Sequence, residues 1–311
     1  MDFRTCAGNS PAILLEGALG ERLKREFGLR ADGPCALAPL VFDPAGRAAL
    51  RALWREYRGI ANRHALPFLA ATPTRRANFE RVRAAGFNEA IILDNVRFLQ
   101  EVRAEDEGEM YVGGLMGCRG DAYTGEGCLN EREARDFHAW QAELFRRAGA
   151  DFLMAGILPT IREAKGIARA MAETGLPYVL SFTIQADGRL IDGTAITDAI
   201  DAIDSLPIGE PAFYMTNCVH PRILLEALAQ PFNRTEAVRR RFLGIQANTS
   251  ALPYAALDGA EDLKCSDPED LAEGMLRLWD EHGLRVFGGC CGTDGRHMEA
   301  IAKKLRFTQL S

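Results

Sequence analysis

The sequence of 311 residues predicts an α/β protein built as a single (β/α)8 (TIM) barrel that spans residues 1–311. Short apolar runs recur along the whole chain, a longer amphipathic segment follows each of them, and the runs number eight with none left over. Eight parallel strand–helix units favour a closed barrel, whereas a doubly wound open sheet is the alternative that the same alternation allows. A prior of about 150 residues per domain would suggest two domains, but barrels often fill ~250 residues or more as one.

The expected strands are brief and apolar on both faces, as buried parallel strands must be. They are Ala12–Leu15, Pro67–Ala71, Met110–Leu115, Phe152–Ala155, Tyr178–Phe182, Ala212–Met215, Leu243–Ala247 and Val286–Gly288. The clearest helical segments between them carry charges at helical spacing. They are Pro44–His64, Asn130–Ala148, Thr160–Thr174, Pro268–Glu281 and His297–Leu305.

Residues at the ends of these segments support the assignment. Two Asp-Pro pairs are typical of a helix N-cap followed by proline in the first turn, and three glycines fall just past helix ends, where a left-handed cap favours glycine. These residues are Asp43-Pro44, Asp267-Pro268, Gly149, Gly175 and Gly283. The long, glycine-rich segment Gly117–Asn130 is expected to lie over the mouth of the barrel.

Composition and charge exclude several classes of protein. Hydrophobic residues make up 47% of the chain and charged residues 26%, which is typical of a globular protein. The formal net charge of −6 argues against a nucleic-acid-binding protein, which needs a clustered basic face. No apolar run approaches the ~20 residues that span a bilayer, and the N-terminus lacks the pattern of a signal peptide. We therefore expect a cytoplasmic protein that binds small molecules and neither nucleic acid nor a membrane; assembly into oligomers is compatible with the sequence.

Two adjacent cysteines carry the densest chemical signal. They lie in Gly288-Gly289-Cys290-Cys291-Gly292-Thr293, directly after the last expected strand, and residues in that place line the active-site mouth of a barrel. Adjacent cysteines are poor disulfide partners, whereas two thiolates in a loop relaxed by glycines can both reach one metal ion. A reducing compartment favours metal binding or catalysis over disulfide formation.

A third thiol, Cys218, follows the expected sixth strand beside Asn217. Three thiolates and one open position match a zinc site that can bind and deprotonate a substrate thiol, which is the chemistry of thiol alkylation. His220 and His297 could serve as ligands instead, but we expect both to cap or begin the helices that follow. The remaining cysteines lack metal spacing and are expected to be dispensable for chemistry: Cys6, Cys35, Cys118, Cys128 and Cys265.

Two other functions are compatible with this pattern. Gly288 and Gly289, followed by a helix start at Gly292–Gly295, could cradle a phosphate as in a barrel lyase or isomerase. That interpretation leaves both cysteines unused and offers no strand-end lysine for a Schiff base. The cysteines could also belong to a non-catalytic zinc-binding or thiol-sensing protein.

Asn217-Cys218, followed by the Gly288–Thr293 motif, resembles the zinc-dependent homocysteine S-methyltransferase family, which includes betaine- and S-methylmethionine-using enzymes. Three further stretches are similar to the family's opening loop, to its fifth-strand region and to an asparagine after its seventh strand: Leu15–Gly20, Asp187–Thr194 and Asn248. The resemblance covers nearly the whole chain. It implies a (β/α)8 barrel, zinc held by Cys218, Cys290 and Cys291, and methyl transfer to a zinc-bound thiol.

The resemblance also implies substrate contacts from Glu16, Gly17, Asn217, Asn248 and the position of Gly156. Glu16 stands where the family usually has aspartate, and Gly156 replaces a glutamate that helps to hold the amino group of homocysteine. A buried ammonium without its carboxylate partner costs several kcal/mol. The acceptor is therefore expected to be homocysteine or a related thiol, and Glu16, one methylene longer than aspartate, could reach into the vacated space.

The methyl donor is expected to be self-contained, because the chain has room for one barrel and none for folate or cobalamin modules. A sulfonium or a quaternary ammonium compound fits this requirement. Aromatic faces often hold such cations. Four aromatic residues near expected strand ends or mouth loops are candidates: Tyr123, Phe182, Tyr214 and Tyr254.

Overall fold

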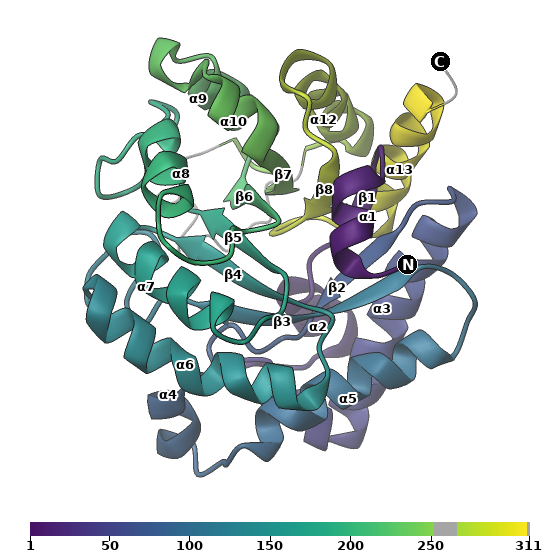
Figure 1. Ribbon diagram of the computed structural model, residues 1–311. Coiled ribbons are helices and arrows are strands. Elements are labelled where there is room, and N and C mark those ends of the chain that lie inside the picture. Colours follow the sequence, from purple (N-terminus) through teal and green to yellow (C-terminus); the bar gives the residue numbers. More distant parts are fainter. Residues whose placement is uncertain (252–265, 310–311) are drawn as a thin grey trace.

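The computed structural model describes residues 1–251 and 266–309, and its strands form a closed parallel barrel in the order β1 to β8 (Figure 1). Closure is made by β1 and β8, where Ile13 pairs with Val286 and Leu14 with Phe287. The predicted barrel is confirmed, and the open-sheet alternative is wrong. The strands are β1 Ile13–Leu15, β2 Phe68–Ala71, β3 Met110–Gly117, β4 Phe152–Leu158, β5 Tyr178–Phe182, β6 Phe213–Val219, β7 Phe242–Ala247 and β8 Val286–Gly289.

Helices follow the strands and surround the barrel (Figure 1). No helix among the described residues combines the length and the apolar character needed to cross a bilayer. The helices are α1 Phe3–Asn9, α2 Gly20–Phe27, η1 Ala38–Phe42, α3 Pro44–Arg63, α4 Phe79–Ala84, α5 Ala90–Ala104, α6 Glu131–Ala148, α7 Ile161–Ala172, α8 Ile196–Asp204, α9 Pro221–Leu228, η2 Pro231–Asn233, α10 Glu236–Arg241, α12 Pro268–His282 and α13 Gly295–Gln309.

The helix ends have the predicted chemistry. The Asp43 side chain accepts a hydrogen bond from Gly46 N, and that of Asp267 accepts one from Glu269 N, so both Asp-Pro pairs begin a helix. The three predicted glycines lie past helix ends in the left-handed region, with φ of 75°, 75° and 74° at Gly149, Gly175 and Gly283.

Three strands continue two or more residues beyond their predicted ends, and β8 continues by one residue, to Gly289. β3 runs on to Gly117, β4 to Leu158 and β6 to Val219. The ladders persist because glycine and polar residues can pair as strands when the neighbouring strand lies alongside, and in β4 and β6 a bulge takes up the irregularity. Gly156, Asn217 and Cys218, which the sequence places after strands, therefore lie within β4 and β6.

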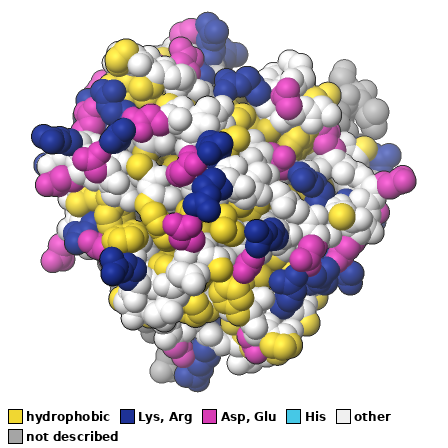
Figure 2. Space-filling model, turned by 60° about the horizontal axis from the view of Figure 1, so that its bottom comes forward, with side chains coloured by type: hydrophobic (Ala, Val, Ile, Leu, Met, Phe, Trp, Pro, Cys, Tyr) yellow, Lys and Arg dark blue, Asp and Glu magenta, His cyan; other side chains and the backbone are white. Residues whose placement is uncertain are grey.

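Strand side chains fill two apolar layers. Ile13 and Leu15 point into a cluster inside the barrel, whereas Leu14 between them packs in the layer between barrel and helices. This alternation follows from the two-residue period of a strand and explains why the strands are apolar throughout. On the surface, lysine and arginine side chains are interspersed with aspartate and glutamate and do not gather into one basic area on the face in Figure 2.

Helix α1 contributes Phe3, Cys6 and Ala7 to the interior cluster, and Phe3 is the aromatic residue among them. The ring of Phe3 stacks on Phe152 of β4 at a centroid distance of 4.2 Å and meets the edge of Tyr111 of β3 at 5.8 Å. Both partners lie at the start of their strands, so α1 covers the end of the barrel opposite the strand C-termini.

Substitution of Phe3 by alanine should therefore destabilise the barrel. Loss of a fully buried ring typically lowers the free energy of unfolding by about 3–5 kcal/mol. The neighbouring Arg4 is exposed, so Arg4→Ala should change it by no more than about 0.5 kcal/mol. Urea unfolding of both variants tests this, and equal stabilities would show that the Phe3 ring of α1 does not stabilise the barrel.

Candidate metal centre and active site

Three cysteine sulfur atoms converge at the mouth of the barrel. The Sγ atom of Cys290 lies 2.9 Å from that of Cys218 and 3.9 Å from that of Cys291, and the Cys218–Cys291 distance is 3.4 Å. Among the residues that the structure describes, these three form the group of histidine, cysteine and acidic side chains compact enough to hold one ion. The cysteines that the sequence singled out from β6 and β8 are thus brought together.

Cys218 reaches this point because the backbone of β6 is bulged. The pairing register with β7 shifts between Asn217 and Val219, and Cys218 adopts a left-handed conformation with φ of 60°. In a regular strand adjacent side chains point to opposite faces. The bulge instead turns both Asn217 and Cys218 into the cavity.

The glycines around Cys290 and Cys291 serve two different purposes. Gly292 has φ of 83°, as expected for a glycine chosen for its backbone freedom. Gly288 and Gly289 are not in that region and are required for close packing instead. A Cβ atom at Gly288 would lie 2.7 Å from Leu15 Cβ, and one at Gly289 would collide with Thr293.

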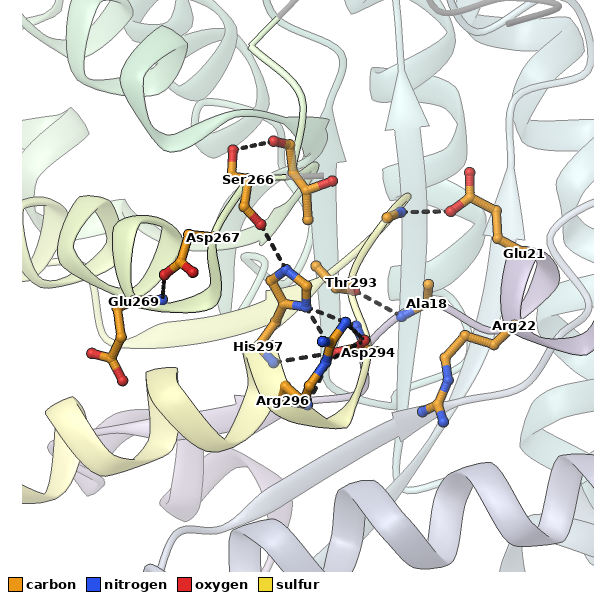
Figure 3. A network of polar contacts seen from close by, with 12 residues as sticks. Ala18, Glu21, Arg22, Ser266, Asp267, Glu269, Thr293, Asp294, Arg296 and His297 are labelled. Carbon is orange, nitrogen blue, oxygen red and sulfur yellow. Dashed lines mark hydrogen bonds and ion pairs between the residues drawn. The ribbon is translucent and has the colours of Figure 1, made fainter. Parts of the chain in front are cut away.

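A hydrogen-bond network holds the cysteine loop against its neighbours (Figure 3). The Thr293 hydroxyl donates to Cys290 O at 2.7 Å and accepts from Ala18 N at 3.0 Å. Gly292 N donates to the Glu21 carboxylate at 2.5 Å. Hydrogen bonds between protein groups thereby join the loop after β8 to the segment after β1.

The two candidate histidines contact backbone atoms near the starts of helices and are not part of the sulfur cluster. His220 is the N-cap of α9, where its Nδ1 accepts from Arg222 N at 3.1 Å. His297 lies in the first turn of α13, with Nδ1 2.8 Å from an Asp294 oxygen and Nε2 3.1 Å from Ser266 O (Figure 3). The expectation that both cap or begin helices is confirmed.

The donor set fits a zinc ion. With Zn–S bonds of about 2.3 Å, tetrahedral geometry would place the sulfurs about 3.8 Å apart, and the observed sides of 2.9, 3.4 and 3.9 Å lie near or below that spacing. Cys290 and Cys291 hydrogen-bond to Cys218, and these bonds lower the pKa of Cys218 well below the ordinary thiol value. Three soft thiol ligands would suit zinc, and all three cysteines line the cavity described next.

A cavity of about 620 Å³ opens beside the sulfurs. Its lining is mainly apolar, with a few converging polar groups, as expected of a small-molecule site. Four of the five substrate residues implied by the family resemblance line it, and so does the donor candidate Tyr123; the four are Glu16, Gly17, Gly156 and Asn217. Asn248 does not line it; its side chain accepts from Ser250 N at 3.0 Å and shapes the turn after β7.

Glu16 is buried and tied to the neighbouring strand. Its carboxyl group accepts from Ala71 N of β2 at 3.1 Å and hydrogen-bonds with Gln246 of β7. Burial raises the pKa of Glu16 to about 8, and these hydrogen bonds only partly oppose it. The group is therefore mostly protonated at neutral pH.

A chain of amide and hydroxyl groups crosses the floor of the cavity to Glu16. Ser181 Oγ donates to Asn217 Oδ1, and Asn217 Nδ2 donates to Gln246 Oε1. Gln246 in turn bonds to Glu16, so the chain joins β5, β6, β7 and β1. These contacts fix the orientation of the Asn217 amide beside the sulfur cluster.

The space above Gly156 has not been taken over by Glu16. A Cβ atom at Gly156 would have Leu115 Cδ1 at 3.3 Å and Asn217 Oδ1 at 3.8 Å among its nearest neighbours. Gly17 has the opposite surroundings, since a Cβ atom there would lie 2.8 Å from the Tyr57 ring. Gly17 thus admits a packing aromatic side chain, whereas a Cβ atom at Gly156 would make one tight contact, with the Leu115 side chain.

The candidate aromatic residues differ in position. Tyr123 lines the cavity, and its hydroxyl group hydrogen-bonds to Cys218. The rings of Phe182 and Tyr214 stack on each other at 5.6 Å in the layer between barrel and helices. These two candidates for donor binding line neither cavity, because strand alternation points them outward into the core. Tyr254 lies outside the described residues.

The segment Gly117–Asn130 lies over the mouth, as predicted, because it carries Tyr123. Both of its ends are held by Glu163 of α7, a buried carboxylate that accepts from Arg119 N at 2.7 Å and Leu129 N at 3.2 Å. His138 Nε2 lies 2.9 Å from the same carboxylate. The sequence analysis did not single out Glu163, because an acidic residue in the first turn of a helix normally hydrogen-bonds to the N-terminal backbone of that helix.

A second cavity of about 350 Å³ meets the first at Tyr123, Asn217 and Cys218. Thr183 and His220 contribute to its wall. Sequence reasoning also missed Gln246 and Arg75, which line the larger cavity. A polar residue within the otherwise apolar strand Leu243–Ala247 was the available signal for Gln246.

Comparisons with known proteins agree with this geometry. The sequence matches the model of the homocysteine S-methyltransferase family over residues 13–305. Homocysteine S-methyltransferase YbgG of Bacillus subtilis (strain 168) is 24% identical, with 94% of each chain covered. Betaine–homocysteine S-methyltransferase 1 of Rattus norvegicus is 26% identical over 64% of this chain, which spans 50% of that protein.

A solved structure has the same fold. The homocysteine methyltransferase MmuM from Escherichia coli, in its metallated form, superposes with a TM-score of 0.76 at 22% identity, covering 96% of this chain and 97% of that one. The match of the family model extends over almost all of the barrel, including both cysteine-bearing strands. The chain therefore belongs to the homocysteine S-methyltransferase family and is a thiol methyltransferase.

Proposed function

We propose that this enzyme transfers a methyl group from a sulfonium or quaternary ammonium donor to homocysteine or a related thiol at a zinc ion held by Cys218, Cys290 and Cys291. The observation that carries the proposal is the triangle of three sulfurs, with sides of 2.9, 3.4 and 3.9 Å, at the edge of a cavity. When bound there, zinc supplies a Lewis acid that activates the acceptor sulfur.

The residues of the chain prepare this site for two substrates. The two cavities share Cys218 and Tyr123, so a donor and an acceptor can approach the sulfur cluster from different sides. Methyl transfer between sulfur atoms requires that approach, because the nucleophile and the leaving group lie on opposite sides of the carbon. The mainly apolar wall of the larger cavity strengthens the electrostatic contacts that are made beside it.

Tyr123 is the aromatic residue whose position supports a role in donor binding. It lies where the two cavities meet, and aromatic faces attract sulfonium and quaternary ammonium groups. Betaine and S-methylmethionine, which stand in the names of two relatives from Rattus norvegicus and Mus musculus, are donors of this cationic kind.

The acceptor pocket is less demanding of an amino group than a site that offers an ionised carboxylate. Gly156 supplies no side chain, and Glu16 is hydrogen-bonded to Ala71 N and mostly protonated at pH 7. A pocket discriminates strongly in favour of thiols with an ammonium group only if it offers that group a partner of opposite charge. Thiols without an α-amino group should therefore compete with homocysteine.

The phosphate-binding alternative receives no support from the loop after β8. Gly292 N is bonded to Glu21, and Arg296 N and His297 N donate to Asp294 at 3.0 and 3.3 Å. These are the N–H groups that a phosphate would need. The membership of a methyltransferase family excludes the non-catalytic alternative.

Removal of the sulfur ligands provides the direct test. We expect purified protein to hold about one zinc per chain, and Cys218→Ala, Cys290→Ala or Cys291→Ala to lose most of the metal and the transfer activity. Cys6→Ala and Cys35→Ala serve as controls, because both thiols are buried elsewhere and should leave the metal content unchanged. Elemental analysis is the measurement. Stoichiometric zinc in all three ligand variants would exclude the assignment.

Glu16 should make the stability of the protein depend on pH. Its pKa is about 8 in the folded protein against 4.5 in an exposed chain, so unfolding releases a proton between these values. The free energy of unfolding should then fall as the pH rises from about 4.5 to 8, and Glu16→Gln should remove that part of the fall, a few kcal/mol. Urea unfolding at pH 5 and pH 8 measures it, with the exposed Glu107→Gln as control. An unchanged pH profile in Glu16→Gln would contradict the assigned protonation state.

Gly156→Glu should restore a preference for an amino group. We expect the wild type to use homocysteine and its des-amino analogue, 4-mercaptobutyrate, with similar kcat/KM values, and the variant to favour homocysteine by at least about tenfold. Gly156→Gln has the same size without the charge and should not. If the wild type already prefers homocysteine strongly, Glu16→Gln decides: loss of the preference assigns the role to Glu16, and retention refutes this account of the pocket.

A further inference from the structure

Arg75 is a half-buried cation of the larger cavity that has no partner within the described part of the chain. It follows β2 by a few residues, and no carboxylate, carbonyl oxygen or aromatic ring among the described residues lies in ion-pair, hydrogen-bond or stacking contact with its guanidinium group. A partly buried charge without a counter-charge is costly to maintain. Such a side chain in a substrate cavity points to a ligand group that supplies the counter-charge.

The fold makes room for this side chain at the end of β3. A Cβ atom at Gly117 would lie 2.7 Å from Arg75 Cγ and 3.0 Å from Arg75 O, so the arginine stem lies directly against the Gly117 backbone. Gly117 is the pairing partner of Gly156 on β4. Two paired glycines thus form the surface beside which a guanidinium group stands.

The other charged groups around the cavity do not neutralise Arg75. Lys24, Arg30 and Asp32 are exposed to solvent at the rim, where their charges are screened. Glu21 accepts the hydrogen bond of Gly292 N. Glu16 is bonded to Ala71 N and Gln246.

We propose that Arg75 binds the carboxylate of the acceptor thiol, at the end of the molecule remote from the sulfur, and that the pocket therefore selects acidic thiols. The guanidinium fork matches a carboxylate with two parallel hydrogen bonds. The inference rests on the proposed function, because the sulfur of the same molecule must reach the cysteine cluster. Arg75 lines the larger cavity with Glu16 and Gly156 and is not part of the second one, which assigns its ligand to the acceptor and not to the donor.

In this proposal a positive side chain, and not a negative one, recognises the end of the acceptor remote from the sulfur. At Gly156 the chain offers no negative side chain, and across the paired glycines it offers a positive one. An ammonium group at that end of the acceptor gains nothing from this arrangement, whereas a carboxylate gains a charge-assisted pair. Arg75 is a specificity-determining residue in this account and takes no part in the methyl transfer itself.

Binding of matched thiols to the metal-loaded full-length protein tests the proposal. Calorimetry compares 4-mercaptobutyrate with 4-mercaptobutan-1-ol, which has the same length and no charge, on the wild type, Arg75→Gln, Arg75→Lys and Arg76→Gln. We expect the wild type to bind the acid at least about tenfold more tightly than the alcohol, as hydrogen bonds between charged groups predict. Arg75→Gln should abolish that ratio, Arg75→Lys should retain part of it, and Arg76→Gln, at an exposed neighbour outside the cavity, should leave it intact.

The outcomes separate this inference from the proposed function. Equal affinity of the wild type for acid and alcohol, or an acid preference that survives in Arg75→Gln, overturns the role of Arg75 and leaves metal-dependent methyl transfer standing. A loss of affinity in Arg75→Gln for S-methylmethionine, with thiol affinities unchanged, also overturns it, because the carboxylate would then belong to the donor. If no thiol binds the metal-loaded wild type and none is methylated, both proposals fall together. Circular dichroism of each variant verifies that the barrel is folded.

Discussion

The left-handed backbone of Cys218 is the constraint on which the arrangement of the active site depends. A non-glycine residue with φ of 60° costs on the order of 1 kcal/mol, and it persists here because β6 is paired on both sides, with β5 and β7. Without the bulge, Cys218 would point toward the helices and its sulfur could not lie 2.9 Å from that of Cys290. Ile157 of β4 also has a left-handed backbone, with φ of 49°, next to a shift in strand register. Two strands therefore each present adjacent residues to the same cavity.

The loop that carries Cys290 and Cys291 is held in place by contacts within the protein. Thr293 joins the Cys290 carbonyl to Ala18, and Gly292 joins the same loop to Glu21. Gly288 permits the loop to pack against Leu15 of β1, the strand that closes the barrel with β8. Barrel closure therefore positions the cysteine loop, and few degrees of freedom would remain to be ordered if the cysteines bind an ion.

The charges in the cavity distinguish this chain from a pocket designed around an ammonium group. Burial keeps Glu16 mostly neutral, Gly156 contributes no carboxylate, and Arg75 stands beside the paired glycines at the ends of β3 and β4. Each of these features lowers the attraction of the cavity for a cationic group. The cysteine cluster and the charge of the rest of the cavity thus depend on separate residues, so that one can vary while the other stays the same.

The sequence by itself determined the barrel, the helix caps and the cysteine cluster, because these depend on patterns local to the chain. Apolar runs such as Tyr178–Phe182, the Asp43-Pro44 cap and the glycine-framed Cys290-Cys291 pair each signal their structure within a few residues. Only the tertiary structure decided which face a side chain presents: it turned Phe182 and Tyr214 outward, and it brought Gln246, Glu163 and Arg75 to positions that no local pattern marked. The physical reason is that strand bulges and the surroundings of a side chain arise from contacts between strands distant in sequence. The protonation of Glu16 follows from the burial that those contacts create.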